Sequence, residues 1–319
     1  MQSPKIGLVL SGGGSRGLAH IGVLKVLHRE QIPIDFIVGT SMGGLIGVLY
    51  ALGLTPNQIM NRLDIPAPTP LENVKMLTSR ARQRRWRKRL AGLVGDKTFA
   101  DLQLPLILMA VDMISGEEVA LREGPLLPAL LATSAVPGVF PPVNLNGQQL
   151  ADGGVIDSLA THMAVKQGAE RMIAVDVHPA LESETLWNDP ISATMGLQIP
   201  MFSSNDQEQA PTEQDKPALD KNEPNKPITI FGFQLSSFLS HDKEKVKVPN
   251  PVSSMWRAVR VMTWYLHQKR LADHPPDILI RPSVDQYGSL DFKDINGPIE
   301  AGIAEAERHV EALRMLLQT

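Results

Sequence analysis

The stretch "GLVLSGGGSRGLAHIGVL", residues 7–24, joins two apolar patterns through a cluster of glycines. The run Ile6–Leu10 is continuously apolar except for Gly7, which is typical of a buried strand. Leu18–Glu30 follows with apolar residues at helical spacing. Backbone N–H groups at the start of a helix favour an anion. The glycine loop therefore predicts either a nucleotide-phosphate site or a site for a developing oxyanion.

The alternation of strand-like and helix-like segments continues as far as Val177. Because strands and helices alternate, we predict a mostly parallel sheet that is covered by helices. The further strands are expected at Phe36–Val38, Leu106–Asp112, Glu118–Arg122, Leu150–Ala151 and Met172–Val177, and the further helices at Met42–Leu52, Pro56–Leu63, Leu126–Thr133 and Ser158–Gln167.

The composition changes beyond this region. Residues 203–227 are polar, acidic and proline-bearing, and the apolar segment "ITIFGFQLSSFL" follows them. We therefore expect a main domain built from residues 1–181 and 250–319, with 182–249 as an insertion that is partly disordered or lid-like. The main domain should end with a helix at Val252–Leu271, a strand at Asp277–Ile280 and a helix at Pro298–Leu317.

The composition of the 319 residues limits the classes of function. The hydrophobic share of 43% is enough for a sizeable core, and the net charge of −3 shows no overall bias toward nucleic acid. The chain has no cysteine, which excludes disulfides and thiolate metal sites. It starts without the pattern of a secretory signal and has no long apolar run. We expect a cytoplasmic protein that can lie peripherally on a membrane.

A second motif favours the oxyanion interpretation of the glycine loop. The predicted strand Phe36–Val38 runs into Gly39-Thr40-Ser41-Met42-Gly43, which has the form G-x-S-x-G. A sharp strand-to-helix turn of this kind exposes a serine hydroxyl as a nucleophile. With a nucleophile at Ser41, the N–H groups of Gly12, Gly13 and Gly14 can stabilise an oxyanion. The glycines also satisfy G-x-G-x-x-G, so a nucleotide site and simple close packing remain alternatives.

The sequence by itself does not identify the base that would activate Ser41. None of the eight histidines lies in a motif that requires it, although His178 follows a strand end. Asp152 lies in "ADGGV", and an aspartate before glycines is most often a turn residue. From the residues alone, the base stays open.

The chain resembles the patatin-like phospholipase family in its small bacterial form. The resemblance rests on "SGGGSRGLAHIGVL", "GTSMGG", "ATSAVPGVFPPV" and "ADGGVIDS", continues through "GAERMIAVDV" and resumes at "PPDILIRPSV" and "GSLDF". It implies a three-layer α/β/α sandwich with a mainly parallel central sheet. It also implies a Ser41–Asp152 catalytic dyad, an oxyanion hole formed by Gly12, Gly13, Gly14 and the Arg16 backbone, and no metal or organic cofactor.

The implied activity is serine lipid acyl hydrolysis through an acyl-Ser41 intermediate, as a phospholipase A, a lysophospholipase or a carboxylesterase. A regulatory or scaffolding protein with little turnover, and an acyltransferase, are the alternatives. The chain departs from the family at Ser158-Leu159-Ala160, where many relatives carry a proline.

A basic segment suggests a partner besides the phospholipid or other acyl ester substrate. Residues 80–89 read "RARQRRWRKR". Such a segment can contact anionic lipid headgroups, although an ordinary solvated helix face is the alternative. The expected membrane contact comprises Arg80, Arg82, Arg84, Arg85, Trp86, Arg87, Lys88 and Arg89, and no nucleic acid is expected.

Overall fold

The computed structural model describes residues 4–63, 79–181, 229–230, 233–234, 251–289 and 292–317. The chain divides into two compact units, residues 1–197 with 256–319, and residues 198–255. In the second unit, β8 (Thr229–Ile230) and β9 (Phe233–Gln234) form an antiparallel pair. The predicted insertion 182–249 otherwise lies outside the described residues, so its character stays a prediction.

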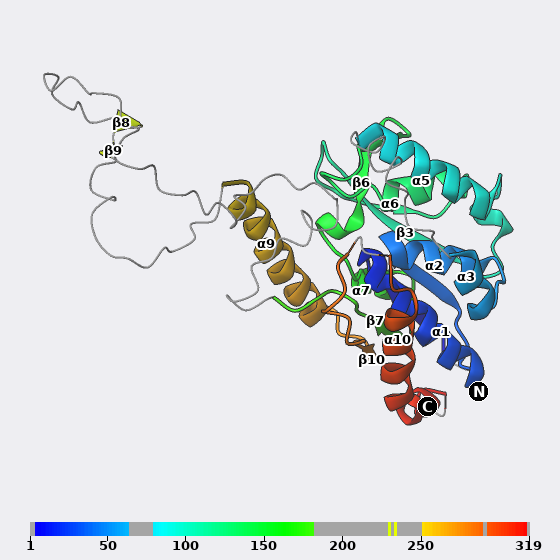
Figure 1. Ribbon diagram of the computed structural model, residues 1–319. Coiled ribbons are helices and arrows are strands. Elements are labelled where there is room, and N and C mark those ends of the chain that lie inside the picture. Colours follow the sequence, from blue (N-terminus) through cyan, green and yellow to red (C-terminus); the bar gives the residue numbers. More distant parts are fainter. Residues whose placement is uncertain are drawn as a thin grey trace, which may run out of the picture. The chain divides into compact units, whose positions relative to one another are not determined.

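A central sheet organises the first unit (Figure 1). Five strands run parallel, in the spatial order β10, β7, β1, β2, β3. Three antiparallel strands extend the β3 end of the sheet, and of these the sequence did not predict β5. The mainly parallel sheet is therefore confirmed. Its strands are β1 (Ile6–Leu10), β2 (Phe36–Thr40), β3 (Leu106–Asp112), β4 (Glu118–Leu121), β5 (Val143–Leu145), β6 (Gln148–Asp152), β7 (Arg171–Val175) and β10 (Ile278–Ile280).

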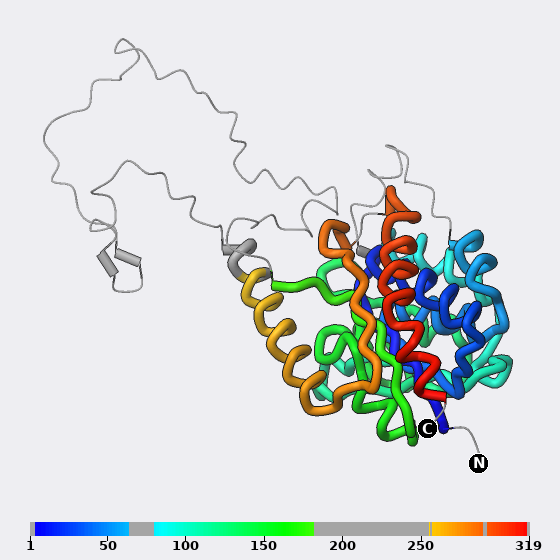
Figure 2. The backbone as a smooth tube through the Cα atoms, turned by 90° about the horizontal axis from the view of Figure 1, so that it is seen from below, coloured from blue at the N-terminus to red at the C-terminus, as the bar shows by residue number. Residues whose placement is uncertain are grey.

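Helices cover both faces of the sheet, because successive side chains of a strand point to opposite faces. In β1, Leu8 and Leu10 belong to one apolar cluster and Val9 belongs to another. The first cluster includes α1 (Ala19–Arg29), α2 (Ser41–Ala51), α3 (Pro56–Arg62), α5 (Ser79–Val94), α6 (Leu126–Thr133), α10 (Asn296–Arg308) and α11 (Val310–Met315). The second includes α7 (Thr161–Lys166) and Leu271 of α9 (Pro251–Asp273). Figure 2 shows α9, in gold, on the side of the fold opposite α3. The expected three-layer sandwich is confirmed.

Most predicted helices differ from the structure by one or two residues at an end, and three differ in how they begin or divide. The first helix begins with a short 3-10 turn, η1 (Gly14–Leu18), which follows the glycine loop. The predicted helix Ser158–Gln167 begins only at Thr161, because Ser158 is hydrogen-bonded to Gly12. The predicted final helix divides at His309, whose φ of −102° and ψ of 3° leave the helical range. Within the described ranges, no helix combines the length and the apolar character that crossing a bilayer requires.

Candidate active site

Ser41 lies at the tip of a sharp turn between β2 and α2. Its φ is 52°, a left-handed conformation that is unfavourable for a residue with a Cβ atom. A Cβ atom on Gly39 would lie 2.6 Å from the Cα atom of Gly44, and one on Gly43 would lie 2.5 Å from the carbonyl oxygen of Ser11. Close backbone packing therefore requires both glycines, and the predicted strand-to-helix turn is present.

Thr133 fixes this turn to the sheet. The Ser41 amide donates to Thr133 Oγ1 at 2.9 Å, and the Thr133 hydroxyl donates to the Met109 carbonyl oxygen at 2.6 Å. Thr133 is completely buried at the end of α6. It lies in "ATSAVPGVFPPV", but nothing in its residue type marked it as part of the site.

We expect Thr133→Val to lower the free energy of unfolding by about 1–3 kcal/mol and to lower kcat, because two buried backbone groups lose their partner. Urea unfolding and ester hydrolysis measure the two effects. Thr161→Val is the matched control, since Thr161 is 1% exposed and its hydroxyl has no hydrogen-bond partner within the described part of the chain. Equal losses in both variants would contradict the role of Thr133.

The strand register brings Asp152 to Ser41. Thr40 of β2 pairs with Met109 of β3, and Asp152 of β6 pairs with Ala110, the next residue of β3. Both β3 residues pair with β4 on their other side, so β2 and β6 lie along the same edge of β3. Since β2 runs parallel and β6 antiparallel to β3, their carboxyl ends meet head-on. Ser41 follows the end of β2 and Asp152 ends β6, so this meeting brings them together.

Burial sets the ionisation of Asp152. The residue is 5% exposed, and the loss of solvation raises the pKa of its carboxyl group to about 6. The neighbouring Ser41 side chain and a hydrogen bond from the Gly154 amide, at 2.8 Å, lower the pKa again by favouring the charged form and so limit this rise. Asp152 is therefore ionised at neutral pH and is a stronger base than an ordinary aspartate.

The glycine loop lies against the nucleophile turn. A Cβ atom on Gly12 would lie 3.2 Å from the Cβ atom of Ser41. The Gly12 amide donates to the Ser158 carbonyl oxygen at 3.0 Å, and Ser158 Oγ donates to the Gly12 carbonyl oxygen at 3.2 Å. The amides of Gly13 and Gly14 make no hydrogen bond within the residues that the structure describes. Of the three glycine amides, these two are the ones free to meet an anion.

Residues Gly288 and Ser289 hold the far side of the glycine loop. The Ser15 amide donates to the Ser289 carbonyl oxygen at 2.8 Å, and Ser15 Oγ donates to the Gly288 carbonyl oxygen at 2.5 Å. The buried Arg16 side chain donates from Nη1 to Ser289 Oγ at 2.8 Å. Gly14 has a φ of 59°, and a Cβ atom there would collide with the Ser289 carbonyl oxygen. The Arg16 side chain thus supports the loop, while the role of its backbone stays a prediction.

His20, which follows the glycine loop, and His178, which follows β7, are both neutral at pH 7. Burial lowers the pKa of His20 and of His178 to about 4. His20 Nε2 lies 2.8 Å from the Ser11 carbonyl oxygen, and His178 stacks on His267 with ring centroids 4.7 Å apart. Among the described residues no hydrogen bond joins a histidine to Ser41, so Asp152 is the titratable group at the nucleophile.

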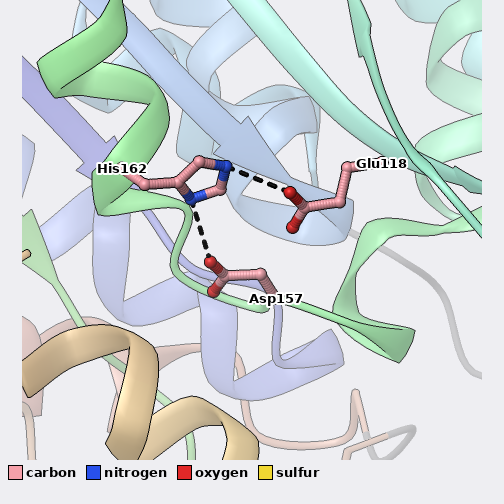
Figure 3. A group of neighbouring side chains, drawn as sticks. All are labelled: Glu118, Asp157 and His162. Carbon is pink, nitrogen blue, oxygen red and sulfur yellow. Dashed lines mark ion pairs between the residues drawn. The ribbon is translucent and has the colours of Figure 1, made fainter. Parts of the chain in front are cut away.

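A second charged cluster, which we call the buried ion-pair ring, comprises Glu118, Asp157, His162 and Arg270. Figure 3 shows His162 between the two carboxylates, with Nε2 3.1 Å from Glu118 and Nδ1 3.2 Å from Asp157. Arg270 Nη1 lies 2.7 Å from Glu118 and 3.4 Å from Asp157. Asp157 and Glu118 raise the pKa of His162 to about 9. His162 is therefore charged at neutral pH.

Glu118, Asp157 and His162 are also the residue types that hold Zn²⁺. The two nitrogens of His162 face different carboxylates, however, and one imidazole supplies only one of them to an ion. Arg270 already bridges both carboxylates. The arrangement fits an ion-pair ring that joins β4, α7 and α9 better than it fits a metal centre.

Comparison with known proteins places these features in a family. The family model described as "Patatin-like phospholipase" matches residues 8–165, which include Ser41 and Asp152. The uncharacterized NTE family protein Rv1063c of Mycobacterium tuberculosis is 33% identical over 200 residues, which cover 57% of this chain and 53% of that protein. Patatin-like phospholipase domain-containing protein 6 of Mus musculus is 31% identical over 205 residues, covering 59% of this chain and 14% of that protein.

The chain thus spans about half the length of the mycobacterial relative. Among solved structures, VipD from Legionella pneumophila superposes with a TM-score of 0.47 at 12% identity, covering 98% of this chain and 67% of that one.

Proposed function

The chain belongs to the patatin-like phospholipase family through residues 8–165, and we propose that it hydrolyses carboxylic esters of lipids with Ser41 and Asp152. The observation that carries the proposal is the strand register that brings Ser41, on its strained turn, next to the buried Asp152, whose pKa is raised to about 6. A nucleophile within hydrogen-bond reach of a base is what acyl transfer through a covalent intermediate requires. The substrates are phospholipids, lysophospholipids or simpler acyl esters.

In the proposed mechanism, Ser41 Oγ attacks the ester carbonyl carbon while Asp152 takes the hydroxyl proton. The amides of Gly13 and Gly14 donate to the oxyanion of the tetrahedral intermediate. The intermediate collapses to acyl-Ser41, and the leaving alcohol takes the proton from Asp152. Water then attacks the acyl group with Asp152 as base, which releases the carboxylic acid and restores Ser41.

The first test is hydrolysis of a short p-nitrophenyl ester and of phospholipid vesicles by the purified protein, with mass spectrometry after reaction with a fluorophosphonate probe. We expect turnover of an ester and one adduct on Ser41. Failure to turn over either substrate, without an adduct on Ser41, would favour the regulatory or scaffolding alternative. An added acceptor alcohol separates hydrolysis from acyl transfer by its products.

We further propose that α5 contacts anionic lipid with its outer face. Arg80, Arg84, Arg87 and Lys88 are exposed and make no ion pair within the described residues. Other residues of the basic segment are turned toward the protein. Trp86 Nε1 donates to Ser134 Oγ at 2.9 Å, and Arg82 Nε donates to the Val139 carbonyl oxygen at 3.0 Å. Because Ser134 follows Thr133, α5 lies close to the nucleophile turn.

We expect Arg84→Gln/Lys88→Gln to weaken binding to vesicles that contain phosphatidylglycerol about 30-fold, at ~1 kcal/mol for each lost charge. Added salt should reduce the difference. The matched control is Arg122→Gln/Lys166→Gln, which removes one exposed arginine and one exposed lysine elsewhere. Vesicle co-sedimentation measures both, and equal binding by the two variants would contradict the role of α5.

A further inference from the structure

Helix α9 presents a stripe of exposed apolar side chains. Val259, Met262 and Tyr265 are 44%, 69% and 64% exposed. Their spacing of three and three residues places them along one face of the helix. Large apolar residues that gather on one exposed face mark an interaction site more often than single exposed ones do. We call these three residues the α9 stripe.

Side-chain hydrogen bonds hold the inner face of α9 to the carboxyl-terminal edge of the sheet. His267 Nε2 of α9 lies 3.0 Å from Asp176 Oδ2, directly after β7, and Arg281, which follows β10, has its Nε 3.1 Å from the same oxygen. Arg270 joins α9 to the buried ion-pair ring. These contacts keep the helix in place although its outer face is apolar.

The direction of α9 places the stripe beyond the edge at which Ser41 lies. α9 leads into the amino end of β10, and β10 runs parallel to β7. The carboxyl end of α9 therefore lies at the amino-terminal edge of the sheet, and the helix runs toward that edge from the carboxyl-terminal edge. His267 is level with the end of β7, and Arg260 reaches the Ala180 carbonyl oxygen at 3.2 Å, farther along the chain. The stripe precedes His267, and Figure 1 shows this part of α9 standing clear of the other helices. Ser41 follows β2, a parallel strand, and therefore lies at the same edge.

The charge of α9 suits an anionic lipid surface. Arg257 and Arg260 lie within the part of the helix that carries the stripe, and this part has no acidic residue. An apolar face combined with basic residues is typical of a helix that lies in a membrane interface. Tyr265 adds an amphipathic ring, a residue type that is common at that depth.

We propose that the α9 stripe inserts into the interfacial layer of an anionic lipid membrane and so brings the Ser41 edge to the bilayer. This inference rests on the proposed lipid substrate and adds the surface through which the protein reaches it. It is distinct from the contact proposed for α5, because it depends on burial of apolar side chains and therefore persists at high salt.

The test is co-sedimentation of the full chain with vesicles of phosphatidylcholine and phosphatidylglycerol at high salt. We expect Val259→Ser/Met262→Ser to weaken binding at least about tenfold. The matched control is Val165→Ser/Met315→Ser, because these residues are 50% and 62% exposed on other helices. The control variant should bind like the wild type. Equal binding by the two variants, or no binding of the wild type, would overturn the proposal.

Two further readouts exclude other occupants of the stripe. If Val259→Ser/Met262→Ser lowers Tm more than the control does, the stripe is packed within the folded chain and the proposal fails. If it converts a dimer to a monomer in size-exclusion chromatography, a second copy covers the stripe and the proposal also fails. Hydrolysis of a soluble p-nitrophenyl ester by the same proteins tests the proposed function separately, because it does not depend on membrane binding.

Discussion

Ser41→Ala should abolish ester hydrolysis, with kcat falling about 10⁴- to 10⁶-fold, because loss of the nucleophile removes the covalent pathway. The fold should survive, since alanine also has a Cβ atom and the turn already accommodates one with a φ of 52°. Hydrolysis of a p-nitrophenyl ester, measured with the Tm of each protein, checks both statements. The fluorophosphonate adduct should disappear with the activity.

Two other variants sharpen this result. Ser41→Gly should be equally inactive but more stable by about 1 kcal/mol, because glycine relieves the left-handed backbone strain. Ser158→Ala is the control for loss of a buried serine next to the glycine loop. It should keep activity within about tenfold of the wild type, because the bond from the Gly12 amide to the Ser158 backbone remains. If Ser41→Ala retains wild-type activity, the proposed nucleophile is wrong.

Asp152→Asn should lower kcat about 10²- to 10⁴-fold, because the amide cannot take the Ser41 proton. Asparagine keeps the shape of the side chain and an acceptor for the Gly154 amide. In the wild type, kcat/KM should fall as the pH drops through about 6, since burial raises the pKa of Asp152 to that value and only the ionised carboxylate is a base. The residual rate of the variant should show no inflection there.

Asp152→Asn should lower activity but should not lower the free energy of unfolding. The pKa of Asp152 is about 6 in the folded protein against an ordinary value of 3.8, so the unfolded chain releases this proton more readily. Above pH 6 the carboxyl group is ionised in both states, and burying this charge lowers the free energy of unfolding by about 3 kcal/mol relative to acid pH. Asp152→Asn removes this cost, and its free energy of unfolding at pH 8 should equal or exceed that of the wild type.

A fall in both activity and stability would mean that Asp152 is a structural turn residue. A wild-type profile that stays flat between pH 5 and 7 would equally contradict its role as the base.

The order of the main elements follows from local features of the sequence. Apolar runs that end at glycines predicted β1 and β2, and helical spacing predicted α1 and α2, because these patterns depend on near neighbours. The turn at Ser41 is local in the same way. Gly39 and Gly43 are needed wherever a strand turns so sharply into a helix.

The strand β5 and the break at His309 were not predicted. Val143–Leu145 is only three residues long and is held by pairing with β6, which no local pattern reports. At His309 the helix ends although the apolar spacing continues into α11. Pairing with a neighbouring strand sets the bounds of β5, and the backbone conformation at His309 sets the end of α10.

What the sequence by itself determined is the nucleophile turn, the glycine loop and the helices and strands that carry them, because each depends on residues that are close along the chain. The family resemblance implied that Asp152 pairs with Ser41, but only the tertiary structure shows how strand register brings the two together, that Thr133 holds the turn and that Ser158 occupies the Gly12 amide. It also decided which side of α5 is exposed and that α9 carries an apolar stripe. The physical reason is that these relations depend on strand register and packing between segments far apart in the chain. Strand register and packing also determine the burial that raises the pKa of Asp152.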